Sequence, residues 1–274
     1  MTHFGYPMTS IGRSKLAAVI KAAGDVVRVT DAATSLGVSR VEAAKTLARW
    51  TQQGWLQRVG TGAYVPVRLE MTGSGEVIED AWVLVPTLFG PAYIGGRSAA
   101  EYWDLTEQIF RDIVVFTARP IRARTKASGG AEFTLRHIPE ERIFGTKTVW
   151  RGQTKVLVSD IDRTMVDMLD DPAVGGGIQH VADCLDRYMR NGEASTEQLI
   201  AYADRLANGA VFKRLGFLAE RHPLSERLVA ACRERLTKGH AKLDPSLEGG
   251  GLITRWKLRV PATWIAGGKH DRQG

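Results

Sequence analysis

The stretch TDAATSLGVSRVEAAKTLARWTQQ, residues 30–53, decides the fold of the first part of the chain. Thr30 is expected to cap a short helix, because a threonine side chain can accept hydrogen bonds from free amides of the first turn. Gly37 is expected to end this helix and to supply a tight turn, as glycine often does. Ser39 is expected to cap a longer helix that ends at Gly54. The stretch therefore predicts two helices joined by a short turn.

The sequence on either side extends this pair into a larger unit. Residues 14–23 are good helix formers and end at Gly24, a helix stop. After the long helix come two short extended runs, residues 55–59 and 63–67, and Gly-Thr-Gly between them is typical of a hairpin loop. Helix, helix, turn, helix and hairpin in this order predict a winged helix-turn-helix over residues 1–70.

Apolar side chains recur at helical spacing in all three expected helices. Three amphipathic helices of this size can bury one small core together, so the apolar stripe of each is expected to face the interior. The expected stripes are Leu16, Val19 and Ile20 in the first helix, Ala32, Ala33 and Leu36 in the second, and Val41, Ala44, Leu47 and Ala48 in the third.

The opposite face of the third helix has the chemistry of a DNA-reading surface. Ser39 and Thr46 can donate hydrogen bonds to phosphates or base edges, and Arg40 can make a bidentate contact with guanine. Lys45 and Arg49 are better placed for phosphates, which position a protein on the duplex and supply most of the affinity. The expected DNA-contacting residues are Ser39, Arg40, Ala43, Lys45, Thr46, Arg49 and, in the hairpin, Arg58.

Positive charge is concentrated at the start of the chain. Residues 1–70 hold nine basic and four acidic side chains, a net charge of +5 out of +7 for all 274 residues. A basic first quarter on a nearly neutral body fits a nucleic-acid footprint. A winged helix can also be a protein-interaction module, but this charge bias favours DNA.

Residues 69–76, LEMTGSGE, are rich in Gly, Ser and Thr and are expected to be a linker. They separate the first domain from a second at residues 77–265, and the polar tail at 266–274 is expected to be disordered. The fold class expected is α+β: the winged helix-turn-helix, then a larger mixed α/β domain with a helical C-terminal half. Strands are expected over residues 109–116, 154–158 and 252–260, and helices over 98–103, 162–170, 178–189, 196–207, 210–220 and 225–236.

Several segments, in order, resemble the AbiEi family of type IV toxin–antitoxin antitoxins. They are GTGAYVPV (60–67), PAYIGGRSAAEYWDLTEQ (91–108), SDIDRTMVDMLDDP (159–172), KRLGFLAER (213–221) and KLDPSLEGG with RWKLRV (242–260). The resemblance implies an antitoxin that represses its own operon by binding inverted repeats in duplex DNA. It also implies that the C-terminal domain counteracts an AbiEii-like nucleotidyltransferase toxin, directly or functionally. One departure is the uncharged wing tip Gly60-Thr61-Gly62, where many relatives are more basic.

The letters D-x-D-x-T at Asp160, Asp162 and Thr164 are also those of haloacid-dehalogenase-like phosphotransferases. There the first aspartate attacks phosphate and the second is a general acid/base beside Mg²⁺. Arg163 stands where that tight loop expects Gly, and mostly helices follow, not the alternating strands of a doubly wound sheet. We therefore expect no enzyme activity, and a helix capped by Asp160 or Asp162 with a core-facing side formed by Met165, Met168 and Leu169.

Other candidate sites are weaker. Gly175-Gly176-Gly177 precedes an expected helix but lacks a phosphate-loop motif, so a plain loop is expected. The histidines never fall at helical spacings for a zinc pair, and Cys184 and Cys232 are far apart, so neither a metal nor another cofactor is expected. Arg97, beside the turn Gly95-Gly96, and Arg163 are the candidates to face a protein partner.

The sequence shows no signal-peptide pattern, and its most apolar stretch, residues 81–95, contains two prolines and is too short to cross a bilayer. Two isolated cysteines also fit a reducing compartment, so a cytoplasmic location is expected. The alternative function left open is that of a ligand-responsive winged-helix transcriptional regulator without a toxin partner.

Overall fold

The computed structural model describes residues 10–67, 78–192, 194–223 and 225–266. The chain divides into two compact units. Unit 1 holds residues up to Ile94 together with 111–143 and 148–158, and unit 2 holds the remainder. The predicted linker at 69–76 and residues 267–274 of the predicted tail lie outside the described residues.

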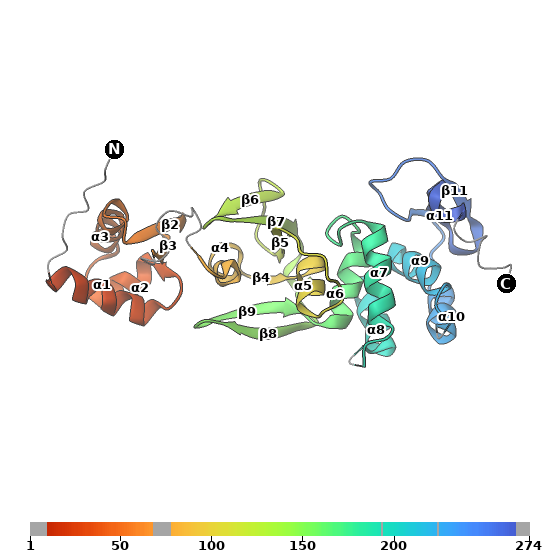
Figure 1. Ribbon diagram of the computed structural model, residues 1–274, viewed down its shortest axis with the longest axis horizontal. Coiled ribbons are helices and arrows are strands. Elements are labelled where there is room, and N and C mark those ends of the chain that lie inside the picture. The colour runs from red at the N-terminus through yellow and green to blue at the C-terminus, as the bar shows by residue number, and fades with distance from the viewer. Residues whose placement is uncertain (1–9, 68–77, 193, 224, 267–274) are drawn as a thin grey trace. The chain divides into compact units, whose positions relative to one another are not determined.

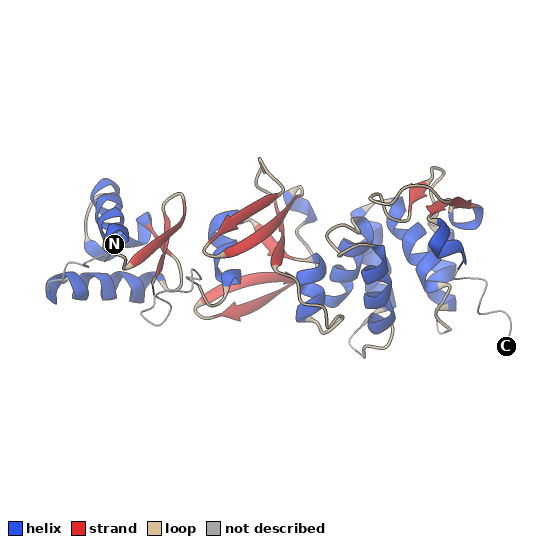
Figure 2. Ribbon diagram, turned by 45° about the horizontal axis from the view of Figure 1, so that its top comes forward, coloured by secondary structure: helices blue, strands red, loops and turns tan. Residues whose placement is uncertain are grey.

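Unit 1 begins with the predicted winged helix-turn-helix, and Figures 1 and 2 show its helices beside a small sheet. Helices α1 (Ser10–Ala23), α2 (Val29–Leu36) and α3 (Arg40–Gln52) bury one core together. Strands β1 (Val27–Arg28), β2 (Leu56–Gly60) and β3 (Ala63–Pro66) form an antiparallel sheet in the order β1-β3-β2. The predicted order of elements is confirmed, with β1 as an additional strand.

Helix α2 follows the predicted chemistry at its C-terminal end but not at its N-terminal end. Gly37 closes α2 with a φ of 64°, and the left-handed conformation explains why glycine stands there. The start of α2 differs, because Arg28 rather than Thr30 occupies the capping position. The amide of Arg28 donates to the Asp31 side chain at 3.0 Å, so the helix begins one residue before Thr30.

The rest of unit 1 is a mixed six-stranded sheet in the order β6-β7-β5-β4-β9-β8. Pairing is antiparallel for β4 with β5 and β6 with β7, and parallel for β4 with β9 and β5 with β7. The stacked rings of Tyr93 and Phe116 and the packed pair Phe89 and Phe133 anchor its buried residues. The elements are η2 (Ala81–Leu84), α4 (Val85–Phe89), β4 (Ala92–Ile94), β5 (Asp112–Thr117), β6 (Thr125–Ser128), β7 (Ala131–His137), η3 (Glu140–Arg142), β8 (Thr146–Arg151) and β9 (Thr154–Ser159).

Unit 2 is mainly helical and packs around α6, which contacts α5, α7, α8 and α9. Helix α6 is buried along nearly its whole length, so it is the centre of the unit's core. The helices are α5 (Gly96–Tyr102), α6 (Ile161–Asp170), α7 (Ile178–Tyr188), α8 (Thr196–Leu206), α9 (Gly209–Ala219), α10 (Glu226–Glu234) and α11 (Ala262–Ala266).

The end of unit 2 differs from the single strand expected over 252–260. A 3-10 turn, η4 (Thr254–Trp256), separates β11 (Gly251–Ile253) from β12 (Leu258–Val260), and β10 (Ala241–Lys242) completes a small sheet. The turn carries Trp256 into the core against Gly216 of α9. A Cβ atom at Gly216 would lie 2.1 Å from the indole, so this close approach requires glycine.

Candidate nucleic-acid interface

Helix α3 presents three basic side chains to solvent. Arg40, Lys45 and Arg49 are exposed, and their charged groups make no hydrogen bond or ion pair with the part of the chain that the structure describes. Thr46 is half-buried beside them. Three of the predicted contact residues therefore carry guanidinium or ammonium groups that are free to meet phosphates or bases.

The start of α3 is fixed by a capping box between Ser39 and Glu42. The Ser39 hydroxyl accepts from the Glu42 amide at 3.2 Å and donates to the Glu42 carboxylate at 2.8 Å, and that carboxylate also accepts from the Ser39 amide at 3.0 Å. The side-chain hydrogen bond from Ser39 lowers the pKa of Glu42. Ser39 is thus confirmed as the helix cap. Its hydroxyl is engaged within the chain, so we assign it to positioning α3.

The interior face of α3 differs from the predicted stripe. Ala43, Leu47 and Trp50 are buried, whereas Val41 is 64% exposed and Ala48 is also exposed. Ala43, which was expected to approach DNA, lies in the core instead. Residues 43, 47 and 50 are spaced four and three apart, so they share the side of the helix that Leu47 buries. Trp50 was the missed signal, since counting it as apolar would have turned the stripe to this phase. Val41 becomes an accessible apolar residue next to Arg40.

The wing is anchored within unit 1. Tyr64 is buried in the winged-helix core. At the tip, the amide of Val29 donates to the Gly62 carbonyl at 3.2 Å, and a Cβ atom at Gly60 would lie 2.6 Å from Leu88 of α4. Arg58 is exposed, and its Nε donates to the Gly60 carbonyl at 3.1 Å. The wing therefore offers one cation, Arg58, beside a tip held against α4.

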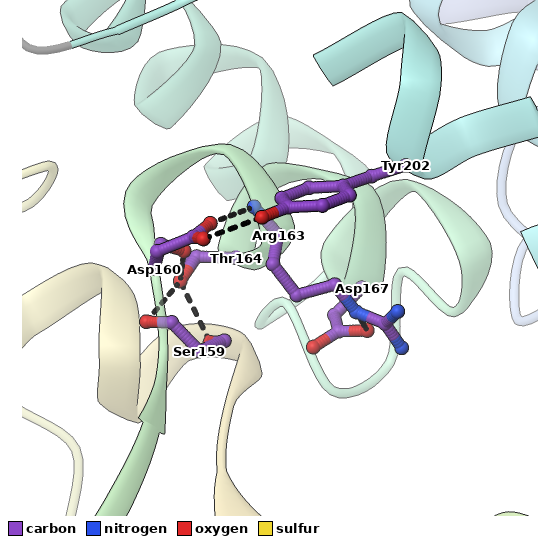
Figure 3. A network of polar contacts seen from close by, with 6 residues as sticks. All are labelled: Ser159, Asp160, Arg163, Thr164, Asp167 and Tyr202. Carbon is purple, nitrogen blue, oxygen red and sulfur yellow. Dashed lines mark hydrogen bonds and ion pairs between the residues drawn. The ribbon is translucent and has the colours of Figure 1, made fainter. Parts of the chain in front are cut away.

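The two arginines expected to face a protein partner make contacts inside unit 2. Arg163 is 1% exposed, and its Nε lies 2.8 Å from the carboxylate of Asp167, which is 2% exposed (Figure 3). Its guanidinium also lies over the Phe144 ring. Arg97 is half-buried and donates to the Ala173 carbonyl at 3.1 Å. The prediction for Arg163 is wrong, because α6 is turned with this side chain into the core, and Arg97 is held mainly by internal contacts.

The D-x-D-x-T letters form a structural network at the start of α6 (Figure 3). Asp160 caps the helix: one carboxylate oxygen accepts from the Arg163 amide at 2.8 Å and the other from the Tyr202 hydroxyl at 2.8 Å. Thr164 turns its hydroxyl back to the Asp160 carbonyl at 2.7 Å. Burial raises the pKa of Asp160. Burial is also the largest cause of the rise in the pKa of Tyr202 to about 12. Both oxygens of the supposed nucleophile are thus used in holding the helix.

Asp162, the supposed acid/base, is buried in a separate set of contacts. Its Oδ1 accepts from the Tyr188 hydroxyl at 2.7 Å and from the Ser195 amide at 2.9 Å. These bonds join α6 to α7 and to the cap of α8. Within the described ranges, no three His, Cys, Asp or Glu side chains gather in a way that could hold a metal ion. The arrangement fits a buried structural joint.

The other weak candidates also have internal roles. The first amide of α7, at Ile178, donates to Asp244 at 3.0 Å, so a carboxylate of the chain itself meets the helix start that follows Gly175-Gly176-Gly177. Cys184 and Cys232 are free and buried, and burial raises the pKa of each thiol to about 12. In the described part of the chain no helix has the length and apolar character needed to span a membrane.

Two comparisons with known proteins agree with this architecture. Residues 14–67 match the family model described as a transcriptional regulator, AbiEi antitoxin. The solved structure of the Rv2827c protein from Mycobacterium tuberculosis resembles the chain with a TM-score of 0.65 at 14% identity, over 97% of each chain. No curated protein matches the chain in sequence. The matched segment covers α1 to β3, the helices and the wing whose exposed face is described above. Residues 14–67 of this chain therefore form a domain that matches the AbiEi antitoxin model of transcriptional regulators.

Proposed function

We propose that this protein is the antitoxin of a type IV toxin–antitoxin system, acting in the cytoplasm. It represses its own operon by binding inverted repeats in duplex DNA, and it counteracts a nucleotidyltransferase-like toxin. The observation that carries the proposal is the set of exposed basic side chains on α3, within a segment that matches the AbiEi regulator family. Unit 2 is left for the antitoxin role.

The residues at the start of α3 can read bases in the major groove. Arg40 is suited to a bidentate contact with the O6 and N7 atoms of guanine. Val41 and Val38 are exposed on either side of Ser39-Arg40, and apolar side chains at this place suit the methyl group of thymine. Lys45 and Arg49, one to three turns further along, suit phosphates. A G·C and an A·T pair next to each other are the expected centre of each half-site.

Arg40→Ala and Lys45→Ala are expected to weaken operator binding in different ways. Arg40→Ala removes a base contact, so the affinity for the operator falls by about 1–3 kcal/mol while binding to random duplex changes little. Lys45→Ala removes a phosphate contact, so both affinities fall together and the salt dependence flattens by about one unit. Fluorescence anisotropy with both duplexes at several salt concentrations measures this difference.

Arg227→Ala is the matched control for these two variants, because Arg227 is an exposed arginine on α10 of unit 2. It removes the same charge and should leave both affinities unchanged. If Arg40→Ala and Lys45→Ala lose equal affinity on operator and on random DNA, the division into base-reading and phosphate-binding residues is wrong.

The antitoxin role is tested by co-expression with an AbiEii-like nucleotidyltransferase toxin in growing cells. Induction of the toxin alone should arrest growth, and this protein should restore it. A truncated form that lacks residues 1–67 should no longer bind the promoter but should keep part of the rescue. Failure of the full chain to restore growth, with normal promoter binding, would favour a regulator without a toxin partner.

Replacing Asp160 and Asp162 together with asparagine is expected to preserve both the fold and growth rescue. Each side-chain oxygen that accepts a backbone hydrogen bond is kept in asparagine, so the cap of α6 and the link to Ser195 survive. We expect a loss of about 1–2 kcal/mol, because hydrogen bonds to a charged acceptor become neutral ones. Circular dichroism is measured beside growth rescue. A folded double variant that fails to rescue would show that these carboxylates take part in chemistry.

A further inference from the structure

A second basic surface lies outside the winged helix, on the segment that leads into edge strand β6. The sequence ARPIRARTK, residues 118–126, holds four basic side chains and no acidic one. Arg119, Arg122, Arg124 and Lys126 are all exposed. The β6–β7 hairpin contains one carboxylate, Glu132, which stands opposite Ala127. Like charges gathered this closely repel one another, so their placement favours an anionic partner.

The side chains of this segment are unequally engaged. Arg119 donates to the Leu88 carbonyl at 3.3 Å, which ties it to α4. The ammonium of Lys126 lies 5.2 Å from the centre of the Phe89 ring, a contact that orients it and leaves its charge exposed. The guanidinium groups of Arg122 and Arg124 make no hydrogen bond or ion pair with any described residue. We call Arg122, Arg124 and Lys126 the basic strip.

The end of β6 contacts the wing. The hydroxyl of Ser128, the last residue of β6, donates to the carbonyl of Val59 in β2 at 2.5 Å. A strand rises about 3.3 Å per residue, so Lys126 and Arg124 lie within about 7 and 13 Å of this contact along the chain. Phosphates of one DNA strand succeed one another about every 3.4 Å along the axis. The strip therefore starts beside the wing and extends over a few phosphate spacings.

We infer that the basic strip binds backbone phosphates of the operator duplex beside the wing, in place of a basic wing tip. The tip Gly60-Thr61-Gly62 carries no charge, and Gly60 packs against Leu88, so the wing itself supplies little to phosphates beyond Arg58. Arg28, opposite Ala63 of the wing, is exposed but donates to the Thr87 hydroxyl at 3.0 Å. The cations of the strip are exposed and their side chains make no hydrogen bond with described residues. The inference rests on the proposed operator binding. It adds the central sheet of unit 1 to the DNA-binding surface and assigns it affinity, not base reading.

The test compares two triple variants of the full-length protein on a labelled duplex that carries the promoter of its own gene. Arg122→Gln, Arg124→Gln and Lys126→Gln together neutralise the strip. Arg227→Gln, Lys238→Gln and Lys242→Gln remove the same charge from exposed positions of unit 2 and form the matched control. Circular dichroism spectra should be unchanged for both, because every substituted side chain is exposed.

Loss of the strip should flatten the plot of log affinity against log salt by about 2–3 units, since each phosphate contact contributes about 0.9. At physiological salt we expect the affinity to fall about 10-fold to 100-fold on both promoter and random duplex. The ratio of the two affinities should stay constant, and the control should behave as the wild type does.

Three results would overturn the inference, and they differ from one another. If the strip variant matches the control while Arg40→Ala still weakens promoter binding, the strip is wrong and the proposed function stands. If the strip variant binds DNA normally but loses growth rescue, the strip serves a protein partner. If the wild type does not bind its promoter, the proposed operator binding fails, and the strip inference fails with it.

Discussion

Asp167→Ala is expected to destabilise unit 2 by about 3–5 kcal/mol, because it leaves the charge of Arg163 buried without its partner. The two side chains are 2% and 1% exposed, and their ion pair lies in the middle of the core helix α6. An arginine cannot lose its proton under ordinary conditions, so the guanidinium has no way to become neutral. Urea denaturation of the full chain, followed by circular dichroism, measures the loss.

Two further variants separate the buried charge from lost packing. Arg163→Met leaves a carboxylate that can take up a proton, so its cost should shrink as the pH falls. The double variant Arg163→Met with Asp167→Leu removes both charges and fills the volume, and it should recover most of the stability. If Asp167→Ala costs less than about 1 kcal/mol, the pair is hydrated in solution and the core assignment of Arg163 is wrong.

The winged helix-turn-helix could be predicted because its signals are local. Gly37 and Ser39 mark the turn and the next helix by backbone preference alone, and the Gly-Thr-Gly loop marks the hairpin. The phase of α3 could not be read as safely. Val41 and Ala43 are both small and apolar, and the choice between them depends on which side of the helix meets α1, α2 and the wing. The predicted stripe included the residue that faces solvent and omitted Trp50.

The central sheet was foreseen only in part, for a physical reason. Its strands β5 and β9 are apolar and were expected near their observed positions. Strand β6, with the sequence TKAS, and β8, with TKTVWR, lie at the two edges, where one side of the ladder and much of each side chain meet water. Such strands carry little apolar pattern, although each pairs with the strand that follows it in the chain.

The role of Arg163 shows the same limit in the candidate site. A charged residue in a polar motif is usually exposed, so the sequence favoured a surface position. Arg163 is buried because its guanidinium contacts both Asp167, one helical turn away, and the ring of Phe144 from another segment. Asp160, in contrast, was placed correctly as a helix cap, because capping depends on residues adjacent in the chain.

Leu47→Ala is expected to destabilise the winged helix by about 2–5 kcal/mol, through lost burial and the cavity it leaves. Leu47 is fully buried where α3 meets the rest of the winged-helix core. That core is small, so each buried side chain supplies a large part of its apolar contacts. Val41→Ala on the same helix is the control: Val41 is 64% exposed, so its truncation should change stability by about 0.5 kcal/mol or less. Hydrogen exchange of the α3 amides in the full chain reports the opening of this region alone.

The same pair of variants also separates folding from DNA reading. Leu47→Ala should lose operator affinity because part of the protein has an unfolded winged helix, and saturating operator should restore protection of the α3 amides by mass action. Val41→Ala should keep full protection without DNA and lose affinity only for operators whose thymine methyl it contacts. If Val41→Ala loses amide protection as Leu47→Ala does, then Val41 faces the core in solution, and the phase of α3 described here is wrong.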